Sequence, residues 1–151
     1  MSELEAQSSK KAAPWHLWLV GVVAVLFNAI GVFDFVMSMA QGPAYMASAG
    51  MTQAQIDHYQ RMPGWMTAVW AIGVFGAFAA SVLILLRRKI AAPVFALSLA
   101  AFLLSLFYTY VLTDGGKVMG SQMAITSAVI AVLLALFMLY AWWQGRRGVL
   151  R

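Results

Sequence analysis

Residues 18–40 read WLVGVVAVLFNAIGVFDFVMSMA, an apolar stretch in which Asp34 is the one charged residue. A helix needs about 20 mostly apolar residues to cross the hydrocarbon core of a bilayer. A surface helix of a soluble protein would instead carry a polar stripe at helical spacing, because one of its faces meets water. The stretch therefore predicts a helix that spans a membrane.

Three further stretches of this kind follow, at residues 65–86, 90–112 and 123–143, and none of them contains Asp, Glu, Lys or Arg. With 63% hydrophobic and 10% charged residues in 151 positions, the chain has no segment from which to build a separate soluble domain. We expect one all-α membrane domain over residues 1–151. The short hinge at residues 87–89 and the loop at 113–122 predict an antiparallel bundle of four transmembrane helices.

The basic residues predict the orientation of this bundle. Only Arg61 and Lys117 lie in the loops on one side. The remaining Lys and Arg residues all lie on the side of the tails 1–14 and 144–151: Lys10, Lys11, Arg87, Arg88, Lys89, Arg146, Arg147 and Arg151. Cytoplasmic flanks carry an excess of Lys and Arg, so both termini are expected in the cytoplasm. Topology and attraction to anionic lipid headgroups explain the net charge of +5, and we expect no nucleic-acid partner.

The location follows from the type of span. Outer-membrane spans are alternating β-strands, whereas these are helical, so the bacterial inner membrane is expected. The first apolar stretch is longer than the apolar region of a secretory signal, and it is expected to remain as an anchor. The chain has no cysteine, which excludes disulfides and thiolate metal sites.

The loop at residues 41–64 is the one sizeable outer segment, and we expect one short helix in it. Thr52 followed three residues later by Gln55 has the spacing of a capping box. Ile56 and Tyr59 would then form a small apolar face on the membrane surface or on the top of the bundle.

Small side chains recur at helical spacing and predict where helices approach one another, because close packing drives helix association in lipid. The predicted packing residues are Gly31, Gly73, Ala77, Ser81, Ala124, Ala128, Ala131 and Ala135. Packing within one bundle is the preferred interpretation. The alternative is an interface between copies of the chain, for which the alanines of residues 124–135 are the candidate.

Asp34 is the strongest candidate for a functional residue, since an ionisable group at that depth is unfavourable unless it faces the bundle interior, water or a partner. Asn28 and Gly31 precede it at intervals of three, and Gly31 would let another helix approach beside the two polar groups. The topology brings further polar residues to the same level. The predicted polar pocket consists of Asn28, Asp34, Tyr108, Tyr110, Gln122 and Thr126.

Two interpretations of Asp34 are open. In one, desolvation in the pocket raises the pKa of its carboxyl group, which then accepts a proton or binds a cation. In the other, which we prefer, Asp34 is hydrated at the interface or is joined to Arg61 or a tyrosine hydroxyl as a structural bridge. Asn28 lies deeper and is expected to form hydrogen bonds between helices.

No enzyme activity, cofactor or metal is expected. His16 and His58 fall on opposite sides of the predicted membrane and cannot share one haem iron. A metal site of Asp57, His58 and Asp114 is conceivable, but adjacent Asp and His residues on a surface helix are usually only solvated. The chain contains no nucleophile elbow, phosphate-binding loop or His-Glu-x-x-His pair.

The chain resembles a group of small four-span proteobacterial membrane proteins of unestablished function, sometimes labelled sugar transporters. The resemblance covers most of the length and rests on these features: Trp18-x-x-Gly21, Asn28-x-x-Gly31-x-x-Asp34, Tyr45, Gln55, Pro63-x-Trp65, Arg87-Arg88, residues 93–98 and Gly148-Val149-Leu150-Arg151. It implies the four-span fold, and the label implies transport of a small solute.

Two classes of function therefore remain. The preferred one is a non-enzymatic accessory or interaction component, which contacts lipid and a membrane-protein partner or a second copy of itself. The alternative is a small-solute transporter, coupled to protons through Asp34. Against transport, the sequence has no internal repeat and no Pro-Gln pair, and its spans show no broken helix.

Overall fold

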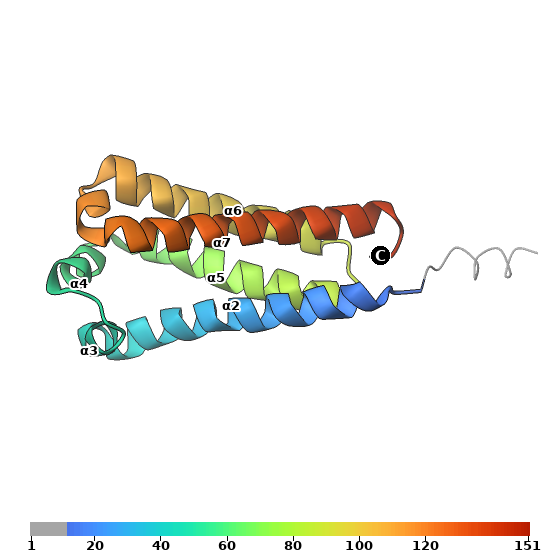
Figure 1. The fold of residues 1–151 in the computed structure, drawn as a ribbon, viewed down its shortest axis with the longest axis horizontal. Coiled ribbons are helices and arrows are strands. Elements are labelled where there is room, and N and C mark those ends of the chain that lie inside the picture. The colour runs from blue at the N-terminus through green and yellow to red at the C-terminus, as the bar shows by residue number, and fades with distance from the viewer. Residues whose placement is uncertain (1–11) are drawn as a thin grey trace, which may run out of the picture.

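The computed structural model describes residues 12–151, in which four long helices are joined in series (Figure 1). These are α2 (Trp15–Gln41), α5 (Gly64–Leu85), α6 (Ala91–Phe107) and α7 (Gly115–Arg146), and a π-helical turn, η1 (Tyr108–Leu112), continues α6. Each span, with η1 counted as part of the third, is long and apolar enough to cross a membrane. The predicted all-α, four-helix fold is confirmed.

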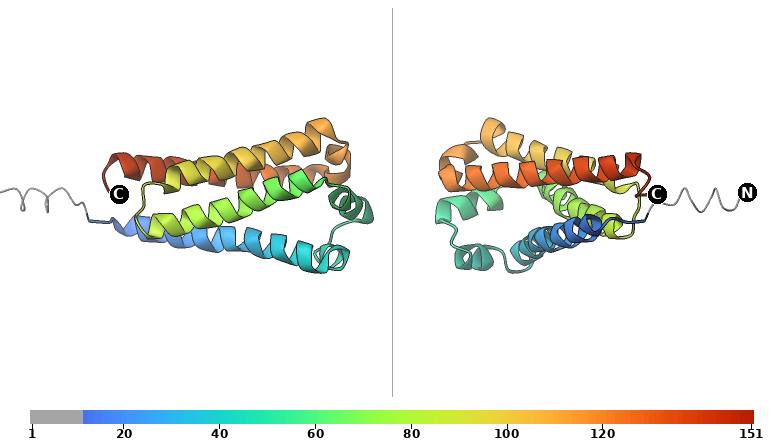
Figure 2. Two further views of the ribbon diagram at one scale, coloured as in Figure 1. Left: turned by 180° about the vertical axis from the view of Figure 1, so that it is seen from behind. Right: turned by 45° about the vertical axis from the view of Figure 1, so that its right-hand side comes forward.

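The helices alternate in direction, and each packs on its neighbour in the chain: α2 on α5, α5 on α6, and α6 on α7. The start of α2 and the C-terminal residues lie together at what we call the terminal end. The short helices α3 (Pro43–Ser48) and α4 (Gln53–Gln60), together with η1, lie at the opposite, loop end (Figure 1). From the terminal end toward the loop end, α2 and α7 diverge (Figures 1 and 2).

The residues after α7 close the terminal end. Gly148 turns the chain back with a φ of 77°, a conformation that glycine adopts without steric penalty. The Arg151 N–H then donates to the Arg87 carbonyl (2.8 Å), and the Lys89 N–H donates to the Arg151 carbonyl (2.7 Å). Val149 and Leu150 are buried against the core of the bundle. This segment, residues 148–151, is called the strap below.

Two side-chain contacts join α2 to α7. Nδ1 of His16 shares a hydrogen bond with the Tyr140 hydroxyl at the terminal end, and the Phe27 and Phe137 rings meet about halfway along, with centroids 6.3 Å apart. Beyond Phe27 the divergence of these two helices leaves space between them.

The small residues of α5 lie at contacts between helices, as predicted. Ala77 and Ser81 are buried, and the Ser98 hydroxyl of α6 donates to the Gly73 carbonyl. A Cβ added at Gly31 would meet Val74 at an ordinary 3.7 Å, so α5 passes beside this glycine without depending on it. The alanines of α7 lie differently: Ala124 and Ala128 are exposed, and Ala131 and Ala135 are half-buried.

The loop end differs from the expected arrangement in two respects. The first loop holds two short helices rather than one, because Gly42 (φ 59°) stops α2 and Pro43 starts a new turn as α3. The expected loop at 113–122 is mostly helical, since α7 begins at Gly115. That glycine is buried so closely against Thr109 and His58 that a Cβ would lie within 3 Å of both residues.

Candidate functional site

A cavity of about 400 Å³ lies between the long helices in the loop half of the bundle. Its α2 wall includes Phe27, Asn28, Gly31, Phe33 and Asp34. The other walls include Tyr45 of α3, Tyr59 of α4, Trp70 and Val74 of α5, Phe102 and Ser105 of α6, Tyr110 of η1, and Met123, Ser127 and Leu134 of α7. Most of this surface is apolar. The cavity exists because α2 and α7 diverge. Its polar groups gather toward the loop end.

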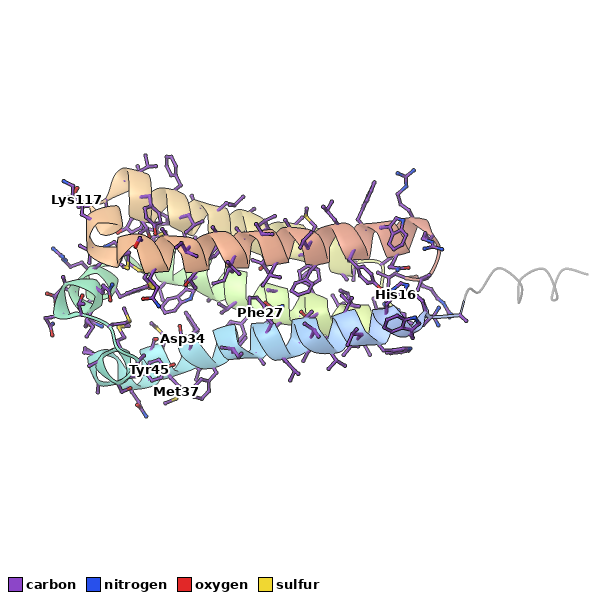
Figure 3. The ribbon with its side chains drawn as sticks, viewed as in Figure 1. His16, Phe27, Asp34, Met37, Tyr45 and Lys117 are labelled. Atoms are coloured by element: carbon purple, nitrogen blue, oxygen red, sulfur yellow. The ribbon has the colours of Figure 1, made fainter. Side chains whose placement is uncertain are left out.

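Asp34 is held at that end by a hydrogen bond from a tyrosine. The Tyr45 hydroxyl donates to Asp34 Oδ1 at 3.0 Å, and Figure 3 shows the two side chains together, with Phe27 further along α2. The Arg61 guanidinium does not reach Asp34, and it donates to the Asp57 carbonyl of its own loop. Of the structural bridges considered from the sequence, the bridge to a tyrosine is the one present.

Three of the six predicted pocket residues line the cavity, namely Asn28, Asp34 and Tyr110. The other three do not. The Tyr108 ring packs against His58 and Trp65, while Gln122 and Thr126 are exposed. On α7 the cavity-facing positions are Met123 and Ser127, one residue further along the helix, which turns Gln122 and Thr126 outward.

Asn28 forms a hydrogen bond between helices, as its depth in the first span predicts. Its Nδ2 donates to the Ser81 hydroxyl of α5 (2.8 Å) and to the Ala24 carbonyl (2.9 Å). The Ser81 hydroxyl in turn donates to the Ala77 carbonyl (2.7 Å). Since these donors are already paired, Asn28 fixes α2 against α5 at the floor of the cavity.

Tyr59 and Trp70 line the cavity but were not predicted as site residues, whereas Tyr45 was part of the family resemblance. Tyr59 comes three residues after Ile56, and both side chains point from α4 toward the bundle, where Ile56 is buried and Tyr59 lines the cavity. The Tyr59 and Trp70 rings lie 5.7 Å apart. The three-residue spacing of Ile56 and Tyr59 on α4 was the available signal, and it predicted only an apolar face.

The predicted capping box is present, and its glutamine has a second role. The Thr52 hydroxyl accepts from the Gln55 N–H, and Gln55 Oε1 accepts from the Thr52 N–H. Gln55 Nε2 meanwhile lies 3.3 Å from the carbonyls of both Val118 and Met119. One side chain therefore caps α4 and holds it against α7.

Those two carbonyls are available because α7 is interrupted immediately after them. Gly120 has φ 76° and ψ 176°, a backbone conformation that is essentially restricted to glycine. The predicted fourth span, residues 123–143, is uninterrupted, but α7 extends beyond it toward the loop end and is interrupted at Gly120. The glycine-rich run before residue 123 had been assigned to a loop, which hid an interruption lying inside the fourth helix. With η1, the fold has two irregular helical segments beside the cavity.

The titratable groups of α3 and α4 respond to these surroundings. The hydrogen bond to Asp34 is the main cause that raises the pKa of Tyr45. Burial, together with the charge of Asp34, raises the pKa of Tyr59. Burial and the nearby Arg61 lower the pKa of His58. Both tyrosines therefore keep their hydroxyl protons at neutral pH, and His58 is uncharged there.

The residues considered for metal binding do not converge. His58 is buried against the Tyr59 and Tyr108 rings, while Asp57 and Asp114 are exposed. Within residues 12–151, no group of three or more His, Asp or Glu side chains is placed to hold a metal ion. His16 lies at the terminal end (Figure 3), whereas His58 is on α4 at the loop end.

No model of a protein family, no curated protein and no solved structure matches this chain. The site is therefore interpreted from its own geometry.

Proposed function

We propose that this chain is a small-molecule-binding protein of a membrane, which takes an amphipathic solute into the cavity between its spans. The single observation that carries this proposal is the cavity itself. Its volume of about 400 Å³ lies within the range of about 300–1,000 Å³ that is usual for ligand sites, and its mainly apolar walls with a few convergent polar groups are typical of them.

The two ends of the bundle support binding from the loop side. At the terminal end, the strap and the His16–Tyr140 contact close the helices together. At the loop end, Asp34 and Tyr45 stand where the helices are widest apart. A solute that enters there would place its polar part beside these two groups and its apolar part against Phe27 and Leu134.

The orientation is part of the proposal. The hinge residues Arg87, Arg88 and Lys89 and the basic residues after α7 lie at the terminal end, whereas Arg61 and Lys117 lie at the loop end. The excess of Lys and Arg on cytoplasmic flanks favours a cytoplasmic terminal end in a bacterial inner membrane. Lys10 and Lys11 add to this excess in the sequence, although they lie outside the described residues. The cavity would then face the periplasm.

We prefer this binding function to a purely accessory role, because a protein that only contacts lipid or a partner does not require a cavity. The binding function keeps the prediction of a non-enzymatic protein. The exposed Ala124 and Ala128 leave the interaction role open as a prediction, with a second copy or another membrane protein packed on α7.

Native mass spectrometry tests the proposal on protein released gently from its own membranes. We expect a small molecule to co-purify reproducibly with the wild-type chain. The variant Ser127→Trp fills the cavity from α7 and should lose that molecule. Val129→Trp introduces the same side chain at a position that is 51% exposed and should keep it. If only lipids or another protein accompany the wild type, the accessory role is favoured and the binding proposal is wrong.

Transport is the second candidate, and the interrupted helix favours it. Transporter sites are often built where helices are discontinuous, and π-turns recur at functional sites. Here the Gly120 interruption and η1 both border the cavity. For a proton-coupled carrier, Asp34→Asn should abolish uptake of the co-purified solute into vesicles driven by a pH gradient, while the variant still folds. Unchanged uptake by Asp34→Asn would exclude coupling through this residue.

A further inference from the structure

The charge of the cavity wall distinguishes one class of solute. Asp34 is the only charged side chain among the described residues that line the cavity, and no Lys, Arg or His is found there. Asp34 is exposed at the loop end of the cavity, and a carboxylate there attracts a cation and repels an anion. The wall is therefore unsuited to phosphates, carboxylates or sulfonates.

This carboxylate is not neutralised by a basic residue of the loop end. Arg61 is engaged with the Asp57 carbonyl, and Lys117 lies at the far corner of the loop end, away from Asp34 (Figure 3). The partner that Asp34 has is the neutral hydroxyl of Tyr45. A hydroxyl donor orients the carboxylate without cancelling its charge, so the charge is available to a ligand.

Aromatic rings surround the same part of the cavity. Phe33 and Tyr45 meet edge to face beside Asp34, with centroids 6.3 Å apart. Tyr59 and Trp70 form a second pair at 5.7 Å, and Tyr110 completes this part of the wall. The faces of such rings attract cations, most effectively those that are easily desolvated. Carboxylate and rings together favour an organic cation over a hydrated metal ion.

The loop-end walls of the cavity, formed just before and at the start of α5 and in the first turns of α7, are suited to apolar groups of such a ligand. Met62, Met66, Met119 and Met123 line them beside aliphatic residues. Methionine side chains are flexible and polarisable, so they adapt to apolar groups of different shape. Surfaces rich in methionine are used where one site accepts several ligands.

We infer that the cavity binds lipophilic organic cations, such as quaternary ammonium or phosphonium compounds, with Asp34 as the counter-ion. This inference rests on the proposed binding function and specifies its ligand class. The cationic centre lies between Asp34 and the rings, and the apolar groups extend toward Met123. Because α2 and α7 diverge on this side, the site accepts compounds that partition into the bilayer.

The experiment is a binding titration on the purified full-length protein in detergent micelles. The probes are tetraphenylphosphonium, the smaller benzyltrimethylammonium, and tetraphenylborate, an anion that matches the first probe in shape. We expect at least one cation to bind one site per chain, with competition between the cations, and tetraphenylborate to leave that site empty. Asp34→Asn should weaken cation binding by about fivefold or more, whereas Asp34→Glu should retain it.

Two controls separate this inference from the function on which it rests. Ser127→Trp should abolish the competed binding, and Val129→Trp should preserve it. If the co-purified molecule is neutral or anionic and still depends on residue 127, the binding function holds and the cation inference is wrong. Equal binding of tetraphenylborate, or full cation affinity in a folded Asp34→Asn variant, also overturns it. If neither a co-purified molecule nor any probe binds, both proposals fail.

Discussion

Nε2 of Gln55 lies 3.3 Å from the carbonyl oxygen of Met119, so the loop between the first two spans is fastened to the interruption in α7. The same side chain accepts the N–H of Thr52 at the start of α4. Val118 and Met119, which follow Gln55 by 63 and 64 positions in the chain, are thereby joined to it in one hydrogen-bonded unit. The loop above the cavity is anchored through this glutamine.

Replacing Gln55 with alanine should loosen α4 selectively. The capping box loses one member, which is worth about 1 kcal/mol for a typical cap, and the Val118 and Met119 carbonyls lose their donor. Hydrogen exchange should therefore accelerate in the amides of α4 while α5 and α6 stay protected. Gln53→Ala is the matched control, because its amide reaches only Asp57 on the exposed face of the same helix. Equal exchange in the two variants would contradict the anchoring role.

Gly115→Ala should be among the most destabilising single-methyl additions at the loop end. Its Cβ would lie 2.7 Å from the Thr109 carbonyl oxygen and 2.9 Å from the His58 ring, and a backbone oxygen cannot move aside as a side chain can. Overpacking of this kind costs about 1–3 kcal/mol. Gly64→Ala has no neighbour within 4 Å and should be nearly neutral. Thermal unfolding in detergent compares the two, and similar midpoints would show that the contact at Gly115 is easily relaxed.

Asn28 and Ser81 should show energetic coupling across the α2–α5 interface. Hydrogen bonds between membrane helices contribute about 0.6 kcal/mol on average and about 1.7 kcal/mol at most. A double-mutant cycle with Asn28→Ala and Ser81→Ala should give a coupling within this range. Ser105 serves as the control, because its hydroxyl donates to Phe102 of its own helix. A cycle between Asn28 and Ser105 should give no coupling, and an equal value in both cycles would refute the specific bond.

Acidification should loosen the loop end through His58. Its pKa is lowered from the ordinary 6.5 in the folded protein, by burial and by Arg61, so the unfolded state binds the proton more tightly. The stabilising contribution of the neutral ring is present above pH 6.5 and is lost as the pH falls through the folded-state pKa. His58→Phe keeps a ring between Tyr59 and Tyr108 but cannot titrate. On acidification, the protection factors of the α4 amides, which are corrected for the intrinsic pH dependence of exchange, should fall more in the wild type than in this variant.

The parts of the fold that the sequence predicted are those governed by hydropathy. The ends of the first three spans and the C-terminal end of the fourth were placed within a few residues of those observed, because Arg87 to Lys89 and the polar loops interrupt runs in which Asp34 is the one charged residue. The start of α7 was placed too late, since Gly115 and Gly116 are typical of turns. Their helical conformation depends on close packing against Thr109 and Tyr110, and local sequence does not report that packing.

The site was only partly predictable for a different physical reason. In a membrane protein, both the inner and the lipid-facing sides of a helix are apolar, so periodicity does not show which residues face a neighbour. Asp34 and Asn28 stood out because polar groups are rare in a span. Ser127 and Thr126 look equally suitable in sequence, and only the rotation of α7 places the first on the cavity wall and the second outside.

The fastening of α2 at one end has a mechanical consequence. His16 ties its start to Tyr140, and Asp34 lies about 27 Å further along, at 1.5 Å per residue. Because Asn28 holds α2 to α5, the two helices can tilt together relative to α7, with the pivot at the terminal end. A tilt of about 5° displaces Asp34 by about 2 Å at that distance from the pivot, and Asn28 by less because it lies closer to the pivot. Small rotations therefore alter the width of the opening at Asp34 far more than the packing near the strap.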